Sequence, residues 1–403
     1  MNILQIGTND IIGGAASISW SLKKELEKKG YKMPMFVSEK KSHKTDVFEI
    51  PRQIHRYFQI LLSNDIDYSK TDWILDTKEF KEADVVHLHN LHSWFFNLKT
   101  LEKISKLKPV IWTLHDMWAI TPHCAHSYEC ELKDGFYQCP SLSSYPRIAW
   151  HNEKYLTSQK KSIYNNSNFN IVVPSLWLKN KVEKSVLKDK GIDLIYNGVD
   201  ENIFKVSDQI DVKRELGIPL DKKVILFLAD GGKKNEYKGW NFLESVINKY
   251  KEDSNILFIC VGGEENGVDP KYSNLLYVSR ISDKAILSKY FSASDVFLYP
   301  SLADNCPLVI LEAMACGVPI VTFDTGGIPE LVKHLENGYI AKYKDSDDLI
   351  RGVSYILNLN SEAINQTKIA SRLKIVSSFT VVKMVNLYEK LYEKVLKNFN
   401  SKL

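Results

Sequence analysis

The amino-acid sequence predicts an α/β protein with two doubly wound parallel sheets. Short apolar runs typical of buried strands alternate with helical patterns along the chain, beginning with "NILQIG" and a helix over about 17–29. The strand-like runs that follow are "MPMFVS", "DVVHLHN", "PVIWTLHD" and "NIVVPS". Because strands that alternate with helices tend to pair in parallel and to be covered on both faces, this order favours wound sheets.

The alternation stops near residue 200 and then restarts, which predicts two domains. A polar stretch follows "LIYNGVDENIF", and "KKVILFLADGG" opens a second series with "NILFICVGG", "NLLYVSR", "DVFLYPS" and "PIVTFD". A chain of 403 residues suits two domains of ordinary size. We therefore expect domains at 1–200 and 201–382, followed by a helix over 383–403 whose apolar stripe must pack on something. One large sheet with a long insertion is the alternative.

Composition excludes some classes of protein. A net charge of +4 is too small for a dedicated nucleic-acid binder, although clustered lysines leave room for local basic faces. No apolar run reaches the ~20 residues of a membrane span. The first residues read as a strand without a charged leader, so we expect a cytoplasmic protein, in which six cysteines do not suggest a disulfide framework.

The loop after the first strand is the first candidate site, because ligands of open parallel sheets bind beyond the carboxyl ends of strands. It reads "GTNDIIGGAASISW" and lacks the GxGxxG fingerprint, which disfavours a dinucleotide-dependent dehydrogenase. Gly13 and Gly14 still allow close backbone approach, and the helix that follows offers amides to an anion. A purely structural turn fits this loop equally well.

Histidines follow two predicted strands. "VIWTLHDMW" places His115 and Asp116 at a strand end, where a histidine can orient a substrate hydroxyl. We favour this role for His115 over a packed histidine hydrogen-bonded to Asp116. For His87, His89 and His92 of "VVHLHNLHSW" we expect ordinary hydrogen-bonded packing.

A cysteine-bearing segment follows at 121–139, "TPHCAHSYECELKDGFYQC". Thiolate and imidazole suit tetrahedral zinc, but the segment contains no CxxC pair. We favour free thiols in a surface insertion over a structural zinc site. The candidate ligands would be Cys124, Cys130 and Cys139 with His123 or His126.

The segment "LADNCPLVILEAMACGVPIV" at 302–321 carries the strongest signal. Proline at its start and Gly317 near its end predict a helix over 307–316, with Pro307 as the first helical residue. The amides of 305–309 would then gather at a helix N-terminus suited to a phosphate. Asp304 lies just outside, whereas Glu312 lies inside an apolar run and needs a polar partner. A ligand with paired hydroxyls, such as a ribose, and a buried salt bridge are the two alternatives.

A lysine-rich loop precedes another helix in the second half. In "LADGGKKNEYKGWNFL", Lys233, Lys234 and Lys238 follow a strand, and lysines there can neutralise a diphosphate. Solvated lysines explain the same pattern equally well.

Taken together, these motifs resemble the retaining glycosyltransferases of family 4 (glycosyl transferases group 1), of the type found in bacterial polysaccharide assembly. "PSLADNCPLVILEAMACGVPIVTFDTGGIPELV" is similar to the C-terminal signature of that family, whose acidic pair is spaced E-x7-E and here reads D-x7-E. "GGAA", "TLHDMW", "NGVD" and "KG" occur in the same order along nearly the whole chain. The resemblance implies the GT-B fold, two Rossmann-like domains facing across a cleft, with the last helix packed back on the first domain.

The resemblance also implies roles for donor-binding residues. Glu312 corresponds to the glutamate that holds the ribose, Asp304 to the residue that contacts the transferred sugar, and Lys238 to the lysine beside the diphosphate. The family's usual arginine is absent, and Lys233 or Lys234 would replace it. The remaining positions are His115 near the reacting sugar, Gly14 and Ala15 near donor phosphate and acceptor, Arg280 near the base, and Asn305, Cys306, Pro307, Leu308 and Val309 beside the sugar and phosphates.

The implied activity is retaining transfer of a hexose-type sugar from a nucleotide sugar to a glycan hydroxyl on a lipid-linked acceptor, without a cofactor or an essential metal. A nucleotide-sugar epimerase and a non-catalytic sugar-nucleotide-binding protein are the alternatives. The cysteine segment resembles one in polysaccharide-assembly members that usually carries a fourth cysteine, where this chain has Phe136. A basic amphipathic helix over 177–190 reads as solvated surface, with peripheral attachment to the inner leaflet of the membrane as the alternative.

Overall fold

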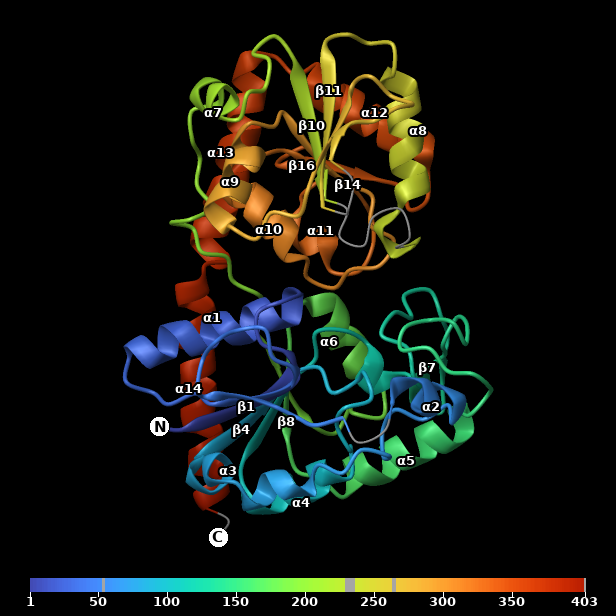
Figure 1. Ribbon diagram of the computed structural model, residues 1–403, viewed down its shortest axis with the longest axis vertical. Coiled ribbons are helices and arrows are strands. Elements are labelled where there is room, and N and C mark those ends of the chain that lie inside the picture. The colour runs from blue at the N-terminus through green and yellow to red at the C-terminus, as the bar shows by residue number, and fades with distance from the viewer. Residues whose placement is uncertain (53–54, 229–235, 263–265, 402–403) are drawn as a thin grey trace. The chain divides into compact units, whose positions relative to one another are not determined.

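The computed structural model describes residues 1–52, 55–228, 236–262 and 266–401 (Figure 1). The chain divides into two compact units, the first formed by Met1–Tyr196 with Met384–Leu403 and the second by Asn197–Lys383. Each unit has its own seven-stranded sheet. The predicted fold class, two wound sheets, is therefore confirmed, and the alternative of a single sheet is wrong.

The sheet of the first unit has the strand order β3-β2-β1-β4-β5-β8-β9, and all neighbouring strands are parallel. Its central strands are buried on both faces, as their continuous apolar sequences predict. The strands are β1 (Ile3–Asn9), β2 (Met35–Glu39), β3 (Val47–Glu49), β4 (Val85–Leu88), β5 (Val110–Thr113), β8 (Asn170–Val173) and β9 (Gly191–Leu194).

Helices cover this sheet and connect its parallel strands. They are α1 (Gly14–Lys28), α2 (Arg56–Leu61), α3 (Lys78–Glu82), α4 (Thr100–Leu107), α5 (Glu153–Asn165) and α6 (Leu176–Val182), with 3-10 turns η1 (Asp72–Asp76) and η2 (Trp118–Ile120). The cysteine segment forms a small hairpin of β6 (Leu132–Lys133) and β7 (Phe136–Tyr137). Large aromatic side chains, including Trp112 and Trp118, fill the core between sheet and helices.

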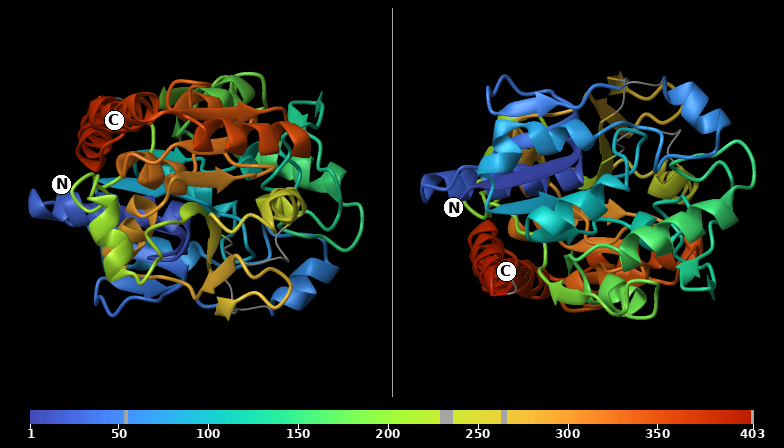
Figure 2. Two further views of the ribbon diagram at one scale, coloured as in Figure 1. Left: turned by 90° about the horizontal axis from the view of Figure 1, so that it is seen from above. Right: turned by 90° about the horizontal axis from the view of Figure 1, so that it is seen from below.

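The last helix, α14 (Val381–Asn400), contributes its apolar stripe to the first unit. Its buried Tyr392 hydroxyl lies 2.8 Å from Nδ1 of His87, and Tyr388 lies 2.9 Å from the Thr113 hydroxyl. On its outer side Glu389 pairs with Lys29 at 2.6 Å. Figure 2 shows α14, in red, close to the N-terminal strand in both views.

In the basic segment 177–190, the helix is shorter and its apolar residues are more buried than the sequence predicts. Helix α6 ends at Val182, and its apolar residues Leu178 and Val182 belong to the core. Trp177 stacks on Tyr128 with ring centroids 4.6 Å apart. The predicted helix over 177–190 is therefore too long. Its apolar side chains pack inside the unit and do not form a surface face. Within the described ranges, no helix combines the length and apolar character that spanning a bilayer requires.

The sheet of the second unit has the order β12-β13-β11-β10-β14-β15-β16. All neighbouring strands are parallel except the short edge strand β12, which is antiparallel to β13. The strands are β10 (Lys223–Leu228), β11 (Ile256–Val261), β12 (Gly267–Val268), β13 (Leu275–Val278), β14 (Val296–Tyr299), β15 (Ile320–Phe323) and β16 (Gly338–Ala341).

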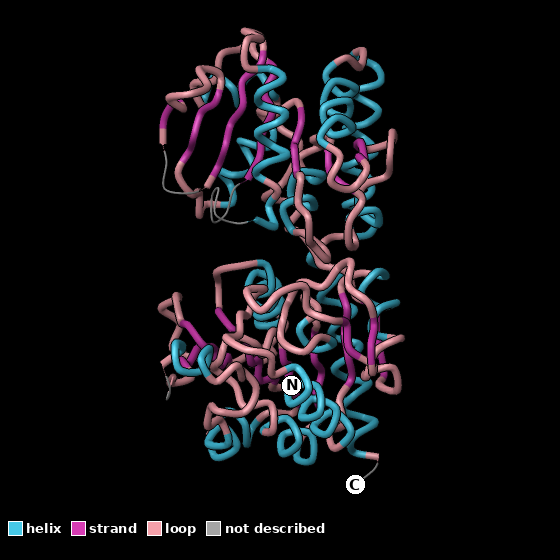
Figure 3. Tube along the Cα trace, turned by 90° about the vertical axis from the view of Figure 1, so that its right-hand side faces the viewer, coloured by secondary structure: helices cyan, strands magenta, loops and turns pink. Residues whose placement is uncertain are grey.

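Two helical layers enclose this sheet, as Figure 1 shows and as Figure 3 shows by secondary structure. Helix α8 contacts α12 on one face, and α10 contacts α9 and α13 on the other. The helices are α7 (Gln209–Glu215), α8 (Trp240–Tyr250), α9 (Lys284–Ser292), α10 (Leu308–Ala315), α11 (Ile328–Leu331), α12 (Ser346–Leu357) and α13 (Ser361–Ser378), with the 3-10 turn η4 (Glu236–Lys238) before α8.

Arg372 of α13 fixes the end of α10. Its guanidinium donates to the carbonyls of Ala315, Phe204 and Glu201 at 2.8–3.0 Å. Hydrogen bonds from a charged donor to buried acceptors are worth ~1.5–3 kcal/mol each and are not additive. We expect Arg372→Met to lower the free energy of unfolding by about 2–3 kcal/mol, measured by urea titration. Arg351→Met is the matched control, because the Arg351 side chain is 60% exposed and solvent screens its ion pair with Asp348. Equal losses in both variants would contradict this role for Arg372.

Candidate active site

Helix α10 begins the candidate site of the second unit. Pro307 is its N-cap, with φ −69° and ψ 120°, and the helix runs over Leu308–Ala315, one residue shorter at each end than predicted. Pro307 is not the first helical residue because its ψ is extended. Since proline has no N–H, the backbone donors at this end come from the other four residues of 305–309. In the first turn, the amides of Leu308 and Val309 have no carbonyl acceptor within the helix.

The residues before α10 are packed rather than exposed. Asn305 and Cys306 are buried, and the Cys306 carbonyl accepts a 3.0 Å hydrogen bond from Nδ2 of Asn197. Burial raises the pKa of the Cys306 thiol to about 12. This cysteine is therefore a neutral packing group that holds the loop in place.

Gly239 explains why Lys238 lies beside this loop. Gly239 has φ 70°, and a Cβ added there would come within 2.0 Å of the Pro300 carbonyl oxygen. Only glycine allows this approach, which brings η4 against the loop after β14. The carbonyl of Tyr237 in η4 accepts a 2.8 Å hydrogen bond from the Leu302 amide. The adjacent "KG" residues of the sequence thus join the loops that follow β10 and β14.

Lys238, Asp304 and Tyr299 form one polar cluster, which we call the Lys238 cluster. The Lys238 ammonium lies 3.1 Å from Oδ2 of Asp304 and 3.1 Å from the Tyr299 hydroxyl, which also donates to Asp304. Burial opposes the charge on Lys238, but the attraction of Asp304 outweighs it and raises the lysine pKa. Burial and Asp304 likewise raise the pKa of Tyr299. The cluster therefore presents an ammonium ion, with its side chain 29% exposed, at the carboxyl edge of the sheet.

Sequence reasoning found Lys238 and Asp304 but missed Tyr299. The available signal was a tyrosine as the last residue of a buried strand, immediately before the loop that carries Asp304. Its ring stacks on Phe297 within the sheet, with centroids 5.8 Å apart, which fixes where the hydroxyl lies.

Glu312 lies in α10 with only 8% of its surface exposed. Among the residues that the structure describes, its carboxylate has no hydrogen bond or ion pair, so a buried salt bridge is not found there. Burial raises the pKa of Glu312 to about 7, and the attraction of Lys284 acts against this rise without overcoming it. An acid held this way in the ligand-free protein is poised to accept hydrogen bonds from a polar ligand.

Other predicted donor residues are dispersed or outside the described structure. Arg280 is exposed beyond the end of β13, and no contact joins it to the Lys238 cluster within the described residues. Lys233 and Lys234 lie outside the described residues. Gly326 and Gly327 follow β15, next to Thr325, whose hydroxyl donates to the Leu302 carbonyl at 3.3 Å.

In the first unit, His115 contacts a second histidine. Nε2 of His115 lies 3.0 Å from Nδ1 of His89, whose Nε2 lies 3.0 Å from Oε1 of Gln5. Burial lowers the pKa of His115 to about 4 and that of His89 well below 6.5. Asp116 pairs with His92 at 2.9 Å instead of with His115, so the alternative of a His115–Asp116 pair is wrong. The expectation of ordinary packing for His89 also missed its contact with His115.

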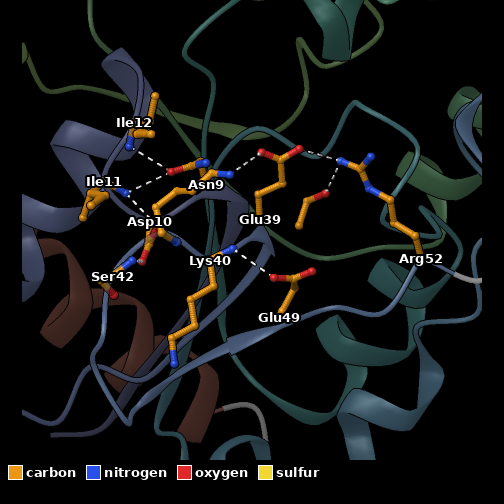
Figure 4. Close-up of polar contacts among 11 residues, drawn as sticks. Asn9, Asp10, Ile11, Ile12, Glu39, Lys40, Ser42, Glu49 and Arg52 are labelled. Atoms are coloured by element: carbon orange, nitrogen blue, oxygen red, sulfur yellow. Dashed lines mark hydrogen bonds and ion pairs between the residues drawn. The ribbon is translucent and has the colours of Figure 1, made fainter.

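Helix α1 begins at Gly14, three residues before the predicted start near residue 17, with Gly13 as an N-cap at φ 99° and no side-chain cap. The preceding loop is fixed by two residues that sequence reasoning missed (Figure 4). The Asn9 side chain accepts from the Ile12 amide at 2.8 Å. The buried Asp10 accepts from the amides of Lys41 and Ser42 at 2.9 and 2.8 Å, which ties the loops after β1 and β2 together.

The cysteine segment is packed around Cys139. Its sulfur accepts from the backbone amides of His123 and Cys124 at 3.4 and 3.2 Å. Although burial opposes the thiolate, these neighbours lower the pKa of Cys139 to about 5. None of Cys124, Cys130 and Cys139 forms a disulfide bond. The described part of the chain contains no group of three or more histidine, cysteine, aspartate or glutamate side chains placed to hold a metal ion.

Comparison with known families matches both halves of the chain. Residues 12–203 match the model of Glycosyltransferase Family 4, and residues 208–373 match that of Glycosyl transferases group 1. Similar curated proteins are N-acetyl-alpha-D-glucosaminyl L-malate synthase of Bacillus anthracis, 26% identical over 55% of this chain and 58% of its own, and a putative colanic acid biosynthesis glycosyl transferase of Escherichia coli, 25% identical over 62% of each. A UDP-Gal:alpha-D-GlcNAc-diphosphoundecaprenol alpha-1,3-galactosyltransferase of Escherichia coli is 29% identical over 50% of this chain and 54% of its own. The chain thus spans only about half to six tenths of the length of these relatives.

Solved structures extend the likeness in fold to the full chain. Sucrose-phosphate synthase from Thermosynechococcus elongatus aligns with a TM-score of 0.69 at 16% identity, covering 99% of this chain and 100% of that one. Anabaena HepE in complex with UDP-glucose aligns with a TM-score of 0.65 at 16% identity, covering 99% of each. Since its two halves match both family models in order, the chain belongs to the family 4 and group 1 glycosyltransferases, with the GT-B fold.

Proposed function

We propose that this protein transfers a hexose-type sugar from a nucleotide-sugar donor to a hydroxyl of a lipid-linked glycan, with retention of anomeric configuration. The observation that carries the proposal is the Lys238 cluster, in which an ammonium ion and a carboxylate share the carboxyl edge of the second sheet with the N-terminus of α10. The names of two relatives, which specify colanic acid and a diphosphoundecaprenol acceptor, support a role in polysaccharide assembly.

In this mechanism the second unit holds the donor. Glu312, unpaired within the described structure, would accept hydrogen bonds from the ribose hydroxyls. The first amides of α10 favour an anion, and Lys238 would meet the charge that develops on the departing diphosphate. Asp304, held by Lys238 and Tyr299, would accept from a hydroxyl of the sugar. The acceptor hydroxyl would attack from the face that the nucleotide leaves.

This donor chemistry requires no cofactor in our proposal, because a lysine and a helix N-terminus supply the positive charge. The base and sugar of the donor are left open, although UDP-glucose is bound by the Anabaena protein of the same fold. Contact with a membrane stays a prediction that follows only from a lipid-linked acceptor.

Donor binding can be tested by thermal unfolding with UDP-, GDP- and ADP-sugars. A ligand at 100 times its dissociation constant adds ~2.7 kcal/mol of stability, which should raise the melting temperature by several degrees for one nucleotide class. The product formed with a lipid-linked oligosaccharide extract is then isolated, and the configuration of its new linkage is assigned by NMR. An inverted linkage would refute retention.

The same assay separates the two competing functions. Isomerisation of the donor without any acceptor would identify an epimerase. Donor binding with no transfer to any acceptor, unchanged in Asp304→Ala, would identify a binding protein. Transfer that depends on Asp304 would exclude both.

A further inference from the structure

Helix α2 of the first unit holds four large apolar side chains out in solvent. Side chains spaced i, i+1, i+4 and i+5 share one face of a helix. Each of the four is between 41% and 57% exposed. They are Tyr57, Phe58, Leu61 and the C-cap residue Leu62. A surface helix usually turns such a face towards the core, but α2 buries only Gln59 and Ile60.

The loop before α5 extends this apolar face. The Trp150 side chain is 50% exposed, and its Nε1 donates to the Leu61 carbonyl at 2.9 Å. The Ser63 hydroxyl accepts from the backbone amides of Ala149 and Trp150 at 2.9 and 2.8 Å, which fixes the loop against the end of α2. We call Tyr57, Phe58, Leu61, Leu62 and Trp150 the α2 patch. Single exposed apolar side chains are ordinary, whereas adjacent ones mark an interaction surface.

The surroundings of the α2 patch are positively charged. Residues 55–62 and 141–152 contain two arginines and two histidines but no aspartate or glutamate. Arg147 is exposed. The first acids that follow these two segments contribute little, because Asp65 is buried and the Glu153 side chain is only 28% exposed. The patch is therefore apolar and aromatic, with a rim that attracts anions.

We propose that the α2 patch docks on an anionic phospholipid bilayer. Tryptophan and tyrosine rings favour the headgroup region, phenylalanine and leucine favour the acyl boundary below it, and arginine is attracted to anionic lipids. A protein partner or a second copy of this chain would fit the apolar side chains but would not account for a rim without acids. The docking needs neither sugar donor nor acceptor, so it is independent of the proposed function.

Sedimentation with phospholipid vesicles tests the docking. We expect the protein to sediment with vesicles of equal parts phosphatidylcholine and phosphatidylglycerol in ~0.05 M NaCl, and to bind about tenfold more weakly to phosphatidylcholine alone. Raising the salt to ~0.5 M should release part of the bound protein, because it screens the arginines. No binding of the wild type to the mixed vesicles at low salt would overturn the proposal, whether or not the protein transfers sugar.

Variants on the exposed face assign the binding to α2. The double variant Tyr57→Gln and Phe58→Gln should bind the mixed vesicles about 10–100-fold more weakly, since two large apolar side chains are lost. Arg147→Gln should weaken binding about fivefold. Leu107→Gln is the matched control, because Leu107 is 55% exposed on α4 of the same unit, and its binding should be unchanged. Thermal unfolding checks that all variants fold. A double variant that binds like the wild type would refute docking through α2.

The position of Trp150 in the bilayer can be measured separately. Vesicles whose acyl chains carry bromine quench the fluorescence of a tryptophan that enters them. We expect the wild type to be quenched, and Trp150→Phe, which keeps an apolar ring, to bind these vesicles while losing most of the quenching. Equal quenching in Trp150→Phe would show that another part of the chain, with its eight tryptophans, meets the lipid, and would overturn the assignment.

The other occupants of the patch give different results. If a second copy covered it, sedimentation velocity would show a dimer in the wild type and a monomer in the double variant. If a different protein covered it, the wild type would be a monomer. Either result without binding to the mixed vesicles would overturn docking on a bilayer.

Discussion

Replacing Lys238 by alanine is expected to lower the rate of sugar transfer by about 10²–10³-fold, the largest effect of any single substitution in the candidate site. The ammonium ion is the cation of the Lys238 cluster, and no side chain of the described loop can take its place 3.1 Å from Asp304. Because we propose that its charge acts mainly on the departing diphosphate, the loss should fall on kcat more than on the KM for the donor. Initial rates over a range of donor concentrations measure both constants.

Two further variants sharpen this prediction. Lys271→Ala removes a surface lysine that is 65% exposed and pairs with Glu244, and its transfer rate should be unchanged. Tyr299→Phe removes only the hydroxyl that contacts both Lys238 and Asp304, and it should cost about tenfold. A Lys238→Ala variant with nearly normal kcat would show that the cluster is structural.

Replacing Glu312 by glutamine is expected to stabilise the ligand-free protein above pH 7 while weakening donor binding. The pKa of Glu312 is raised from 4.5 to about 7, so the folded protein resists ionisation that the unfolded chain undergoes freely. The resulting loss in the free energy of unfolding is absent below pH 4.5, grows between pH 4.5 and 7, and is complete above pH 7. A shift of this size corresponds to about 3 kcal/mol, which glutamine does not incur.

Urea titrations of wild type and Glu312→Gln at pH 4.5 and pH 8 measure the effect. The two proteins should have similar free energies of unfolding at pH 4.5 and should differ by about 3 kcal/mol at pH 8. Donor affinity should fall by about 10–100-fold in the variant, because a carboxylate is a stronger acceptor than an amide. Glu336→Gln, at an exposed glutamate, should change neither quantity. A destabilised Glu312→Gln would show that the carboxylate has a partner in the folded protein.

The fold could be predicted because its signals are local and repeated. Each central strand is a continuous apolar run, and helix α10 is bounded by Pro307 and Gly317, so its limits were predicted to within one residue. Helix α6 was predicted too long because the apolar residues beyond Val182, such as Leu187, pack into the core without helical backbone. Tertiary packing decides the conformation of such a segment, and periodicity alone does not reveal it.

The sequence predicted the charged residues of the candidate site but not the residues that contact them. Lys238 and Asp304 stand out in loops after strands, but Tyr299 ends an apolar strand and reads as core. The link between His89 and His115 joins residues 26 positions apart through the neighbouring strands β4 and β5, and the residue pattern does not state which strands pair. Gln5 is hidden for the same reason, as a polar residue among the buried positions of strand β1.

Helix α14 has a consequence for the order in which the protein can fold during synthesis. The first unit is assembled from both ends of the chain, since Met384–Leu403 belongs to it, whereas the second unit is a continuous segment. During synthesis, Tyr392 is made only after the whole second unit, so the buried ring of His87 cannot contact it before then. N-terminal domains usually fold first during synthesis, but here the second unit can be completed while the first unit still lacks its last helix.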